Sequence, residues 1–362
     1  ELYYSKDIDR SKRIFDSLII SDCENCAWVI YCGLAYNMLY SHNIRNCFDS
    51  SFLFDCRNCS HCFMSANLRN QQYIFRGKKY PKEKYEELIK KIDTGSYKVF
   101  QELVFEFEKM KEKTIHRFAD MGKVVDSTGD ALRNAKNAKN CFNSYDVENI
   151  KWVARTFALK DSYDVNYGGL NSELVYEFVT GGTISHNVLF NVASVFPIND
   201  SIYNAWCGGS NLFGCFGVKE KQYCILNKQY EKEEYEKLVP KIIEHMNRMP
   251  YKGKNGRIYT YGEFFPFELS LYGYNETLAQ EMYPLSEEEI KKRGYKYKEK
   301  EIRQHTVSVL SEDLPDNISE VNDDILKEII ECEHKGECLH QCTTAFKIHP
   351  EELSFYRKFK LP

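Results

Sequence analysis

The residues best suited to chemistry are three cysteines and two histidines near the C-terminus. The cysteines are Cys332, Cys338 and Cys342, and they are interleaved with His334 and His340. Zinc is held by three or four thiolate or imidazole ligands that short turns bring together. We therefore predict a structural zinc site with the three cysteines as ligands and one of the two histidines as a fourth. Free or structural thiols are the alternative.

A second group of thiols lies in the N-terminal block and is a weaker metal candidate. Its members are Cys56, Cys59, Cys62 and His61, with Cys23, Cys26 and Cys32 upstream. Cysteine also packs readily as a small apolar residue. Asn-Cys pairs recur at Cys47 and Cys141 without a Cys-x-x-Cys partner, so packing inside a repeat is the favoured interpretation.

Four acidic residues could serve a polysaccharide-acting enzyme, because glycoside hydrolysis uses pairs of carboxylates. They are Asp146, Asp161, Asp164 and Glu177. Asp146 and Asp164 recur in Tyr-Asp-Val contexts, so a structural repeat explains them without catalysis. Three further carboxylates are Glu263, Glu268 and Glu276. Their segment is aromatic and broken by Gly and Pro, which predicts a packed loop. The sequence therefore assigns no catalytic residue.

Nucleic-acid binding is a further possibility, raised by a basic run with interleaved tyrosines at residues 291–303 and by the basic tail Arg357–Lys360. Such a run could contact phosphates, but a solvated helix face is favoured. The whole chain carries 49 basic and 53 acidic residues, a net charge of −4. This balance argues against a protein that mainly coats nucleic acid.

Asparagines recur at short steps, as in an internal repeat. The first series is Asn25, Asn37, Asn46 and Asn58, with steps of 12, 9 and 12 residues, and the second is Asn140, Asn149 and Asp161, with steps of 9 and 12. Asparagine suits turns because it tolerates the left-handed conformation, and stacked turns would align like residues in ladders. The two steps sum to 21. We therefore predict a mainly β chain with helical insertions, a parallel β-solenoid (β-helix) with coils of about 21 residues.

A longer repeat, offset by 150 residues, supports an internal duplication. The pair Gln72-Tyr73 matches Gln222-Tyr223, and the residues that follow also match: Tyr80, Tyr85 and Leu88 with Tyr230, Tyr235 and Leu238. Each copy runs into a Lys/Glu-rich helix. Apolar residues at spacings of three and four predict helices over 81–92 and 96–116. Their favoured role is to cover exposed β-structure, because open edges must be hidden.

These patterns divide the chain into five predicted segments. They are a first β-solenoid segment at 20–76, a helical hairpin insertion at 80–118, a second β-solenoid segment at 121–226, a helix with an extended aromatic arm at 230–310, and a Cys-rich zinc-ribbon-like tail at 328–362. The sequence contains no run of eighteen apolar residues, so no transmembrane helix is expected. It begins at Glu1 without an initiator Met, so we expect a fragment or an additional leader.

Several motifs resemble a known group of proteins, the uncharacterised cysteine-rich zinc-ribbon proteins of metagenome-derived bacterial genomes. The motifs lie at 221–230, 262–266, 274–277 and 341–346, in Phe355-Tyr356-Arg357 and in the final Leu-Pro. The resemblance implies a zinc-ribbon tail that continues past Pro362, so that the ribbon is incomplete here. Members are sometimes labelled CaiB/BaiF-type CoA transferases, but no α/β crossover pattern or nucleotide-binding loop is visible in this sequence.

The sequence leaves three functions open. The first is a non-catalytic scaffold or binding protein with a structural zinc ion, whose repeated faces contact a protein partner or another copy of the chain. The second is a nucleic-acid-associated zinc-ribbon protein, and the third is a polysaccharide-acting enzyme. The 14 cysteines are clustered at short spacings, which favours thiols or metal over a disulfide framework and predicts a cytoplasmic protein without a membrane role.

Overall fold

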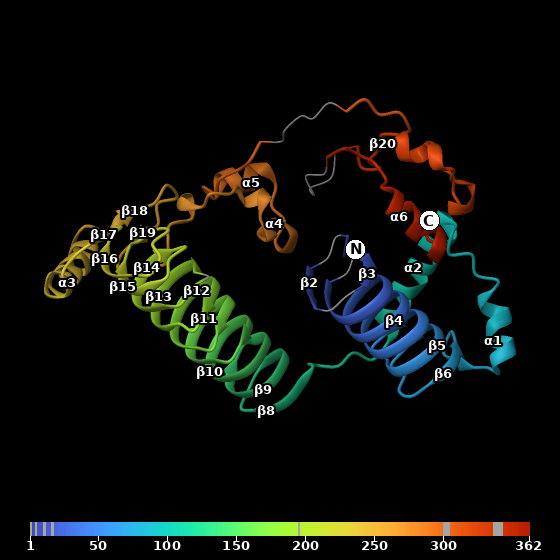
Figure 1. The fold of residues 1–362 in the computed structure, drawn as a ribbon, viewed down its shortest axis with the longest axis horizontal. Helices are drawn as coiled ribbons and strands as arrows, with labels where there is room; N and C mark the ends of the chain where they lie inside the picture. The colour runs from blue at the N-terminus through green and yellow to red at the C-terminus, as the bar shows by residue number, and fades with distance from the viewer. Residues whose placement is uncertain are drawn as a thin grey trace. The chain divides into compact units, whose positions relative to one another are not determined.

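The computed structural model describes residues 2–3, 6–9, 12–15, 18–194, 196–299, 305–335 and 343–362. The chain forms two compact units (Figure 1). Unit 1 contains residues 1–116 and 300–362, and unit 2 contains residues 117–299. Each unit is built on one sheet of mostly parallel strands.

The sheet of unit 1 has seven strands. They are β1 (Leu2–Tyr3), β2 (Lys6–Asp9), β3 (Lys12–Phe15), β4 (Leu18–Phe54), β5 (Arg57–Ala66), β6 (Gln72–Phe75) and β7 (Lys78–Lys79). Parallel partners are twelve residues apart, as in Arg45 with Arg57 and Ser60 with Gln72. The chain therefore returns beside itself every twelve residues, and in the described residues from 18 to 75 no helix lies between neighbouring parallel strands.

Unit 2 has ten strands in sequence order across its sheet. They are β8 (Met121–Val125), β9 (Gly129–Lys139), β10 (Cys141–Phe157), β11 (Leu159–Leu170), β12 (Ser172–Thr183), β13 (His186–Ser194), β14 (Ile198–Ala205), β15 (Gly209–Phe213), β16 (Lys221–Ile225) and β17 (Lys228–Gln229). The register is twelve residues between Glu148 and Lys160, but thirteen between Leu159 and Ser172. Gly168 and Gly169 accommodate the extra residue, since Gly169 has a φ of +83° and glycine adopts this conformation without steric cost.

A three-residue pattern explains this winding. In β4, every third residue is buried, as at Cys26, Val29 and Cys32. The residue directly before such a buried position has a positive φ: Trp28 precedes Val29, and Tyr31 precedes Cys32. Each left-handed residue turns the chain by one corner, and four corners make one twelve-residue turn. Left-handed backbone is unfavourable for most L-residues and least so for Asn and Asp, which is why these residues are frequent at the corners.

The buried cysteines and serines satisfy backbone groups inside each turn. The Ser50 hydroxyl donates to the Phe48 carbonyl at 2.7 Å and accepts from the Cys62 amide at 2.9 Å. The Cys59 thiol likewise donates to the Arg57 carbonyl at 3.2 Å. A buried polar group needs a partner, and both side chains are small enough to provide one. The cysteine content of unit 1 is thus explained by its core.

The predicted fold class is wrong. The structure is a mixed α/β chain with a seven-stranded and a ten-stranded, mostly parallel sheet, and no 21-residue coil exists among the described strands. The error has a physical cause. Asn25 and Asn37 are one turn apart, whereas the nine residues from Asn37 to Asn46 span three corners of the same turn. Adding the two steps therefore combined a full turn with part of one.

Asparagines on successive turns do form ladders. Asn46 Nδ2 donates to Asn58 Oδ1 at 3.0 Å, and Asn58 Nδ2 donates to Asn70 Oδ1 at 3.0 Å. In unit 2, Asn149 accepts from Asn137 at 3.1 Å and donates to Asp161 Oδ1 at 2.8 Å. Both ladders run from turn to turn along one corner, so the two units are wound in the same way.

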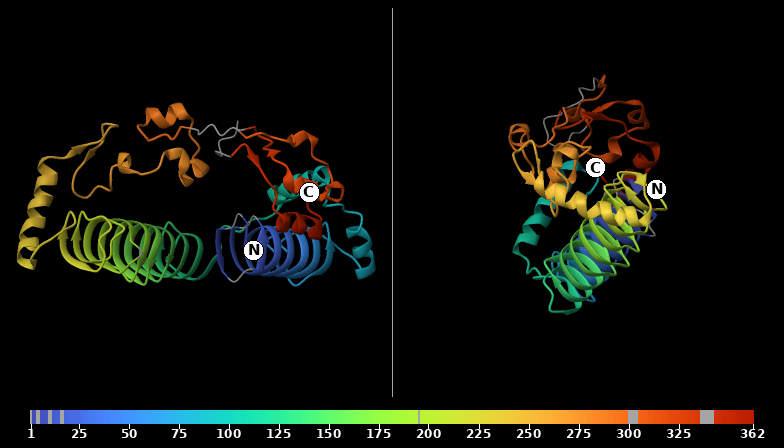
Figure 2. Two further views of the ribbon diagram at one scale, coloured as in Figure 1. Left: turned by 45° about the horizontal axis from the view of Figure 1, so that its top comes forward. Right: turned by 90° about the vertical axis from the view of Figure 1, so that its left-hand side faces the viewer.

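The predicted duplication is confirmed at the last turn of each sheet. In unit 1, β6 and β7 form an antiparallel hairpin followed by α1 (Lys82–Ile89); in unit 2, β16 and β17 are followed by α3 (Lys232–Arg248). The buried Tyr85 ring lies 5.8 Å from Tyr73, and the buried Tyr235 ring lies 5.7 Å from Tyr223. Figure 2 shows α1 and α3 beside the final turns of their own sheets.

The remaining elements are short, except for one long helix in unit 1. This helix, α2 (Tyr97–Lys113), packs on β4 and β5. The others in unit 1 are β20 (Ile330–Glu331), β21 (Ala345–Phe346) and α6 (Pro350–Phe359), whose Phe355 packs near Ala27. Those in unit 2 are β18 (Tyr251–Lys252), β19 (Ile258–Tyr259), α4 (Leu278–Met282) and α5 (Glu287–Lys292). Short 3₁₀ helices lie at 267–269, 274–276, 311–313, 318–320 and 323–327.

Candidate binding face

One outer side of unit 1 carries an aromatic stripe, which α2 covers. The stripe consists of Trp28, Leu39, Tyr40, Phe52, Phe63, Met64 and Phe75. Phe100 and Phe107 of α2 lie against it: the Phe100 ring is 5.1 Å from Trp28, and the Phe107 ring is 5.6 Å from Tyr40. Phe52 and Phe107 are both 0% exposed. The predicted covering role of this helix is therefore confirmed.

Unit 2 carries a corresponding stripe, which we trace from its register. Paired positions run from turn to turn through Lys151, Tyr163, Tyr176, Leu189, Ile202, Phe213 and Ile225. The corner residues that follow them include Trp152, Asp164, Glu177, Phe190 and Tyr203. The stripe ends at the duplicated hairpin, as it does in unit 1, so the two stripes are equivalent in position.

The half of this stripe nearest the hairpin is covered. Phe190 and Tyr203 stack at 4.6 Å, and Tyr261 and Phe265 pack over Tyr203 at 6.1 and 5.8 Å. The Tyr203 hydroxyl fixes the covering segment, because it donates to the Glu263 carbonyl and accepts from the Gly262 amide, both at 3.0 Å. Burial raises the pKa of Tyr203 to about 12, so this hydroxyl keeps its proton and its role as a donor.

The other half is open, and we call it the open stripe: Trp152, Tyr163, Asp164, Tyr176 and Glu177. Trp152 is 52% exposed and Tyr163 is 47% exposed. Tyr176 lies at the boundary, where its ring makes an edge contact of 5.5 Å with Phe190. A half-exposed tryptophan and tyrosine that continue a buried aromatic cluster are characteristic of a binding surface.

Two carboxylates lie within the open stripe. Asp164 and Glu177 occupy adjacent turns at one corner, because Tyr163 pairs with Tyr176. Burial raises the pKa of Asp164, against the opposing charge of Lys151. Burial, with the nearby charges of Asp164 and Glu263, also raises the pKa of Glu177, although a hydrogen bond with the Tyr176 side chain lowers it. Glu177 Oε2 is buried and makes no hydrogen bond in the described structure. Clustered acidic groups of this kind favour a cationic partner.

Cationic groups near this surface already have partners within unit 2. The Arg257 guanidinium forms an ion pair with Glu263, and the Lys151 ammonium lies 3.8 Å from the Trp152 ring centroid. The positive charge of Arg257 also lowers the pKa of the Glu177 carboxyl, but the causes that raise this pKa are larger. Three carboxylates, Asp164, Glu177 and Glu263, therefore face two cations, Lys151 and Arg257. The open stripe combines aromatic surface with an excess of one negative charge.

The other acidic candidates serve local structure. Asp146 accepts from Asn134 at 2.6 Å, as Asp161 does from Asn149 in its ladder. Glu268 accepts from the Tyr251 hydroxyl at 3.0 Å, and Glu276 accepts from the Gly273 amide at 2.7 Å. The structure thus brings Asp164, Glu177 and Glu263 near one another. The other candidate carboxylates instead accept local hydrogen bonds.

The N-terminal thiols lie in the core of unit 1. Cys56, Cys59 and Cys62 are buried among apolar side chains, whereas His61 lies at an outer corner with its ring 5.2 Å from Tyr73. Within the described part of the chain, no group of three or more His, Cys, Asp or Glu side chains is arranged to hold a metal ion. The packing alternative matches this arrangement, and metal binding at these cysteines stays a prediction.

The C-terminal zinc candidates are described only in part. Cys338, His340 and Cys342 lie outside the described residues. Cys332 follows β20, its amide donates to the Thr344 carbonyl at 2.9 Å, and its sulfur lies 3.9 Å from His334 Nδ1. The antiparallel pair of β20 and β21 places residues 330–331 beside residues 345–346.

The basic run at 291–303 is also described only up to residue 299. Lys291 forms an ion pair with Glu287 at 2.5 Å, and it is also near Glu299. In the C-terminal tail, Arg357 pairs with Asp323 at 2.6 Å. Two of the charges expected to contact phosphate are thus engaged within the protein, and nucleic-acid binding stays a prediction.

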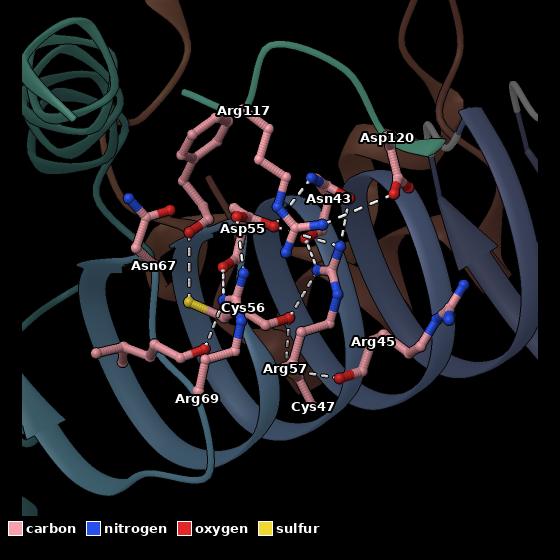
Figure 3. A network of polar contacts seen from close by, with 12 residues as sticks. Asn43, Arg45, Cys47, Asp55, Cys56, Arg57, Asn67, Arg69, Arg117 and Asp120 are labelled. Atoms are coloured by element: carbon pink, nitrogen blue, oxygen red, sulfur yellow. Dashed lines mark hydrogen bonds and ion pairs between the residues drawn. The ribbon is translucent and has the colours of Figure 1, made fainter. Parts of the chain in front are cut away.

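A polar network around the buried Asp55 carboxylate in unit 1 illustrates a structural use of charge (Figure 3). Asp55 is 5% exposed and contacts Arg57 at 3.3 Å and Arg69 at 2.9 Å. Asn43 donates to the same carboxylate at 3.1 Å. The arginines cross from one turn to another, since Arg57 Nη2 also donates to Asn43 Oδ1 at 3.0 Å. Paired and hydrogen-bonded charges of this kind can be buried.

The sequence did not single out Trp152 and Tyr163. A signal existed in unit 1, where Trp28, Tyr40 and Phe52 recur every twelve residues. This twelve-residue period matches the twelve-residue step between asparagines, which indicates that aromatic side chains occupy one corner of successive turns. In unit 2 the thirteen-residue turns obscure it.

Comparisons with known proteins do not assign a family. No family model matches the chain, and no curated protein matches it. One solved structure with partial similarity is the crystal structure of a protein described as an acetyltransferase, from Desulfovibrio desulfuricans G20. It shows 11% identity and a TM-score of 0.11 over 56% of this chain, which spans about half (51%) of that structure. A TM-score this low supports no statement about fold or function. No helix among the described residues is long and apolar enough to cross a membrane.

Proposed function

We propose that this protein is a non-catalytic binding protein that uses the outer face of unit 2 to contact a protein partner. The open stripe carries the proposal. Its Trp152 and Tyr163 are half exposed, yet they continue a cluster that is buried at Phe190 and Tyr203. Aromatic side chains of this type contribute strongly to protein interfaces.

Co-purification from native lysate tests this function, using matched variants. The first variant combines Trp152→Ser and Tyr163→Ser. The control combines Phe142→Ser and Phe157→Ser, which replace aromatic side chains of similar exposure outside the stripe. We expect a specific protein to be retained by the wild type and the control, and lost from the stripe variant. Equal retention by both variants, or no specific protein with any of the three, would contradict the proposal.

We also propose a structural zinc ion in the C-terminal tail, supported by Cys332 and His334, whose sulfur and Nδ1 atoms lie 3.9 Å apart after β20. Zinc sites of this kind contribute directly to local folding. Elemental analysis of the reduced, full chain is expected to give about one zinc per chain, and Cys332→Ser is expected to reduce it. A metal-free wild type, or a variant with unchanged zinc content, would overturn the assignment.

A cytoplasmic location completes the proposal. It is supported by the buried free thiols of the core, such as Cys47, Cys59 and Cys62, since reducing compartments keep such groups unpaired. Fractionation of cells that make the untagged protein tests it: recovery with the membrane or secreted fraction would contradict a cytoplasmic location.

A further inference from the structure

We infer that the open stripe of unit 2 binds an amphipathic helix whose apolar face is flanked by lysine or arginine side chains. This inference deepens the binding function proposed above, because it specifies what the partner presents. It is based on how the equivalent stripe of unit 1 is covered, and on the charge of the open stripe itself.

Unit 1 shows what this surface accepts. Its stripe is covered by α2, a seventeen-residue helix, with Phe100, Leu103 and Phe107 at spacings of three and four. Side chains at these spacings share one face of a helix. The Phe100 ring also lies 5.8 Å from Phe52, so it contacts more than one turn of the sheet. A helix laid across the turns is thus an occupant that this type of corner accommodates.

Unit 2 provides a cover for only part of its stripe. Helix α3 packs at the last turn, where Tyr235 meets Tyr223. The segment around Tyr261 and Phe265 then covers Phe190 and Tyr203. The stripe continues beyond this cover through Tyr176 to Tyr163 and Trp152. Because the open part continues an interface already formed within the chain, an added helix would extend the covered surface.

The charges determine which helix fits. In unit 1 the turn between β6 and β7 supplies a cation and the helix supplies an anion: Arg76 forms a bidentate pair with Glu106 of α2 at 2.7 and 2.6 Å. In unit 2 the open stripe supplies Asp164 and Glu177 instead, and Glu177 Oε2 is buried with no hydrogen bond in the described structure. A helix with lysine or arginine beside its apolar face would pair with these carboxylates.

The probe for this inference is a synthetic helical peptide with the Phe-x-x-Leu-x-x-x-Phe spacing of α2 and lysines on both flanks of that face. A matched peptide carries glutamate in place of every lysine. Both are labelled and titrated with the full chain, and affinity is measured by fluorescence anisotropy at low and high salt. We expect the lysine peptide to bind at least about tenfold more tightly, with the difference reduced by salt.

Variants locate the binding. Asp164→Asn with Glu177→Gln is expected to remove most of the preference for lysine while leaving apolar binding. Trp152→Ser with Tyr163→Ser is expected to weaken both peptides by about tenfold or more, and Phe142→Ser with Phe157→Ser is expected to change neither. Equal binding of the two peptides to the wild type, or equal loss in the control variant, would overturn the inference.

Failure here is distinguishable from failure of the binding function. A lysate partner that depends on Trp152 and Tyr163, together with no peptide binding, would refute the helix but retain the function. Sedimentation of the wild type and the stripe variant provides one further outcome. A dimer that the stripe variant abolishes would identify a second copy as the occupant, and would thereby refute the basic helix.

Discussion

The sheets of the two units are built in the same way, but their aromatic stripes are covered to different extents. Each has left-handed residues at the corners, asparagine ladders, and a hairpin followed by a helix. The turns have twelve residues in unit 1 and eleven to thirteen residues in unit 2. In unit 1 the aromatic stripe lies under α2. In unit 2 the stripe is covered near the hairpin and open at Trp152 and Tyr163. The same corner of the sheet is thus core in unit 1 and partly surface in unit 2. Its role therefore depends on whether another segment packs over it, and not on the fold of the sheet.

The largest expected effect compares one aromatic side chain from each stripe. Phe107→Ala removes a fully buried ring and should reduce the free energy of unfolding by about 3–5 kcal/mol. Trp152→Ala removes a half-exposed ring and should cost less than about 1 kcal/mol. Hydrogen exchange of each unit under mild denaturant measures both. Similar costs would show that the open stripe is in fact covered, and would break the comparison.

The next effect uses His42, which lies beneath the cover of unit 1, with its ring 5.2 Å from Phe107. Burial, helped by the Lys111 charge, lowers the pKa of His42 to about 4. The unfolded chain takes up this proton near its ordinary pKa of about 6.5, and the folded chain does so only near 4. Stability is therefore present above about pH 6.5 and is lost as the pH falls toward 4, by about 2–3 kcal/mol for this partly buried group.

Denaturation of the wild type and of His42→Phe between pH 7 and pH 4 measures this loss. The substitution keeps an aromatic ring between Tyr40 and Phe107 but removes the titration. The loss attributed to His42 is the difference between the two proteins. Identical pH profiles would show that His42 is not held neutral by the α2 cover.

A third effect concerns the cover of unit 2. Tyr203→Phe removes the hydroxyl that bonds to the Gly262 amide and the Glu263 carbonyl. We expect the free energy of unfolding to fall by about 1–2 kcal/mol, because the Glu263 carbonyl and the Gly262 amide both lose a part-buried hydrogen bond, and we expect faster hydrogen exchange at Gly262. Tyr163→Phe on the open stripe is the control, and it should leave exchange at Gly262 unchanged. If Gly262 exchanges equally fast in all three proteins, this hydroxyl does not hold the segment.

The smallest expected effect tests what the units share. Asn58→Ala and Asn149→Ala each place a residue with a Cβ but no amide at a left-handed corner, and each interrupts a ladder. We expect each substitution to lower the free energy of unfolding of its unit by about 1 kcal/mol. Asn58→Gly and Asn149→Gly should cost less, because glycine relieves the backbone strain. Clearly unequal costs in the two units would show that their winding differs after all.

Some of this could be read from residue spacing. Asn46 and Asn58 do stack one turn apart, and α2 covers the sheet as its apolar spacing indicated. The turn length could not be read correctly, because asparagine suits any left-handed corner and therefore occurs at intervals of nine as well as twelve. The thiols gave a similar ambiguity: Cys59 donates to a backbone carbonyl, a role that serine fills equally well at Ser50.

The candidate site was predictable only in fragments. Asp164 and Glu177 were selected as acidic residues, but their adjacency depends on a thirteen-residue turn made possible by Gly168 and Gly169. The contribution of Glu263 depends on the Tyr203 hydroxyl, which lies sixty residues away in the chain. Tertiary packing of this kind leaves no mark in local spacing. The metal assignments at Cys332 and at Cys56 stay predictions.

Because a corner recurs every three residues, a residue's place within the three-residue unit decides whether its side chain points into the core. Adding or removing three residues changes one turn by one corner and keeps every core side chain pointing inward. A single added residue shifts this three-residue register. Glycine absorbs the change at Gly169 and Gly182, whereas the thirteen-residue step from His186 to Asn199 contains no glycine. Lineages of such chains are therefore expected to vary in length mostly by multiples of three, with glycine at some of the exceptions.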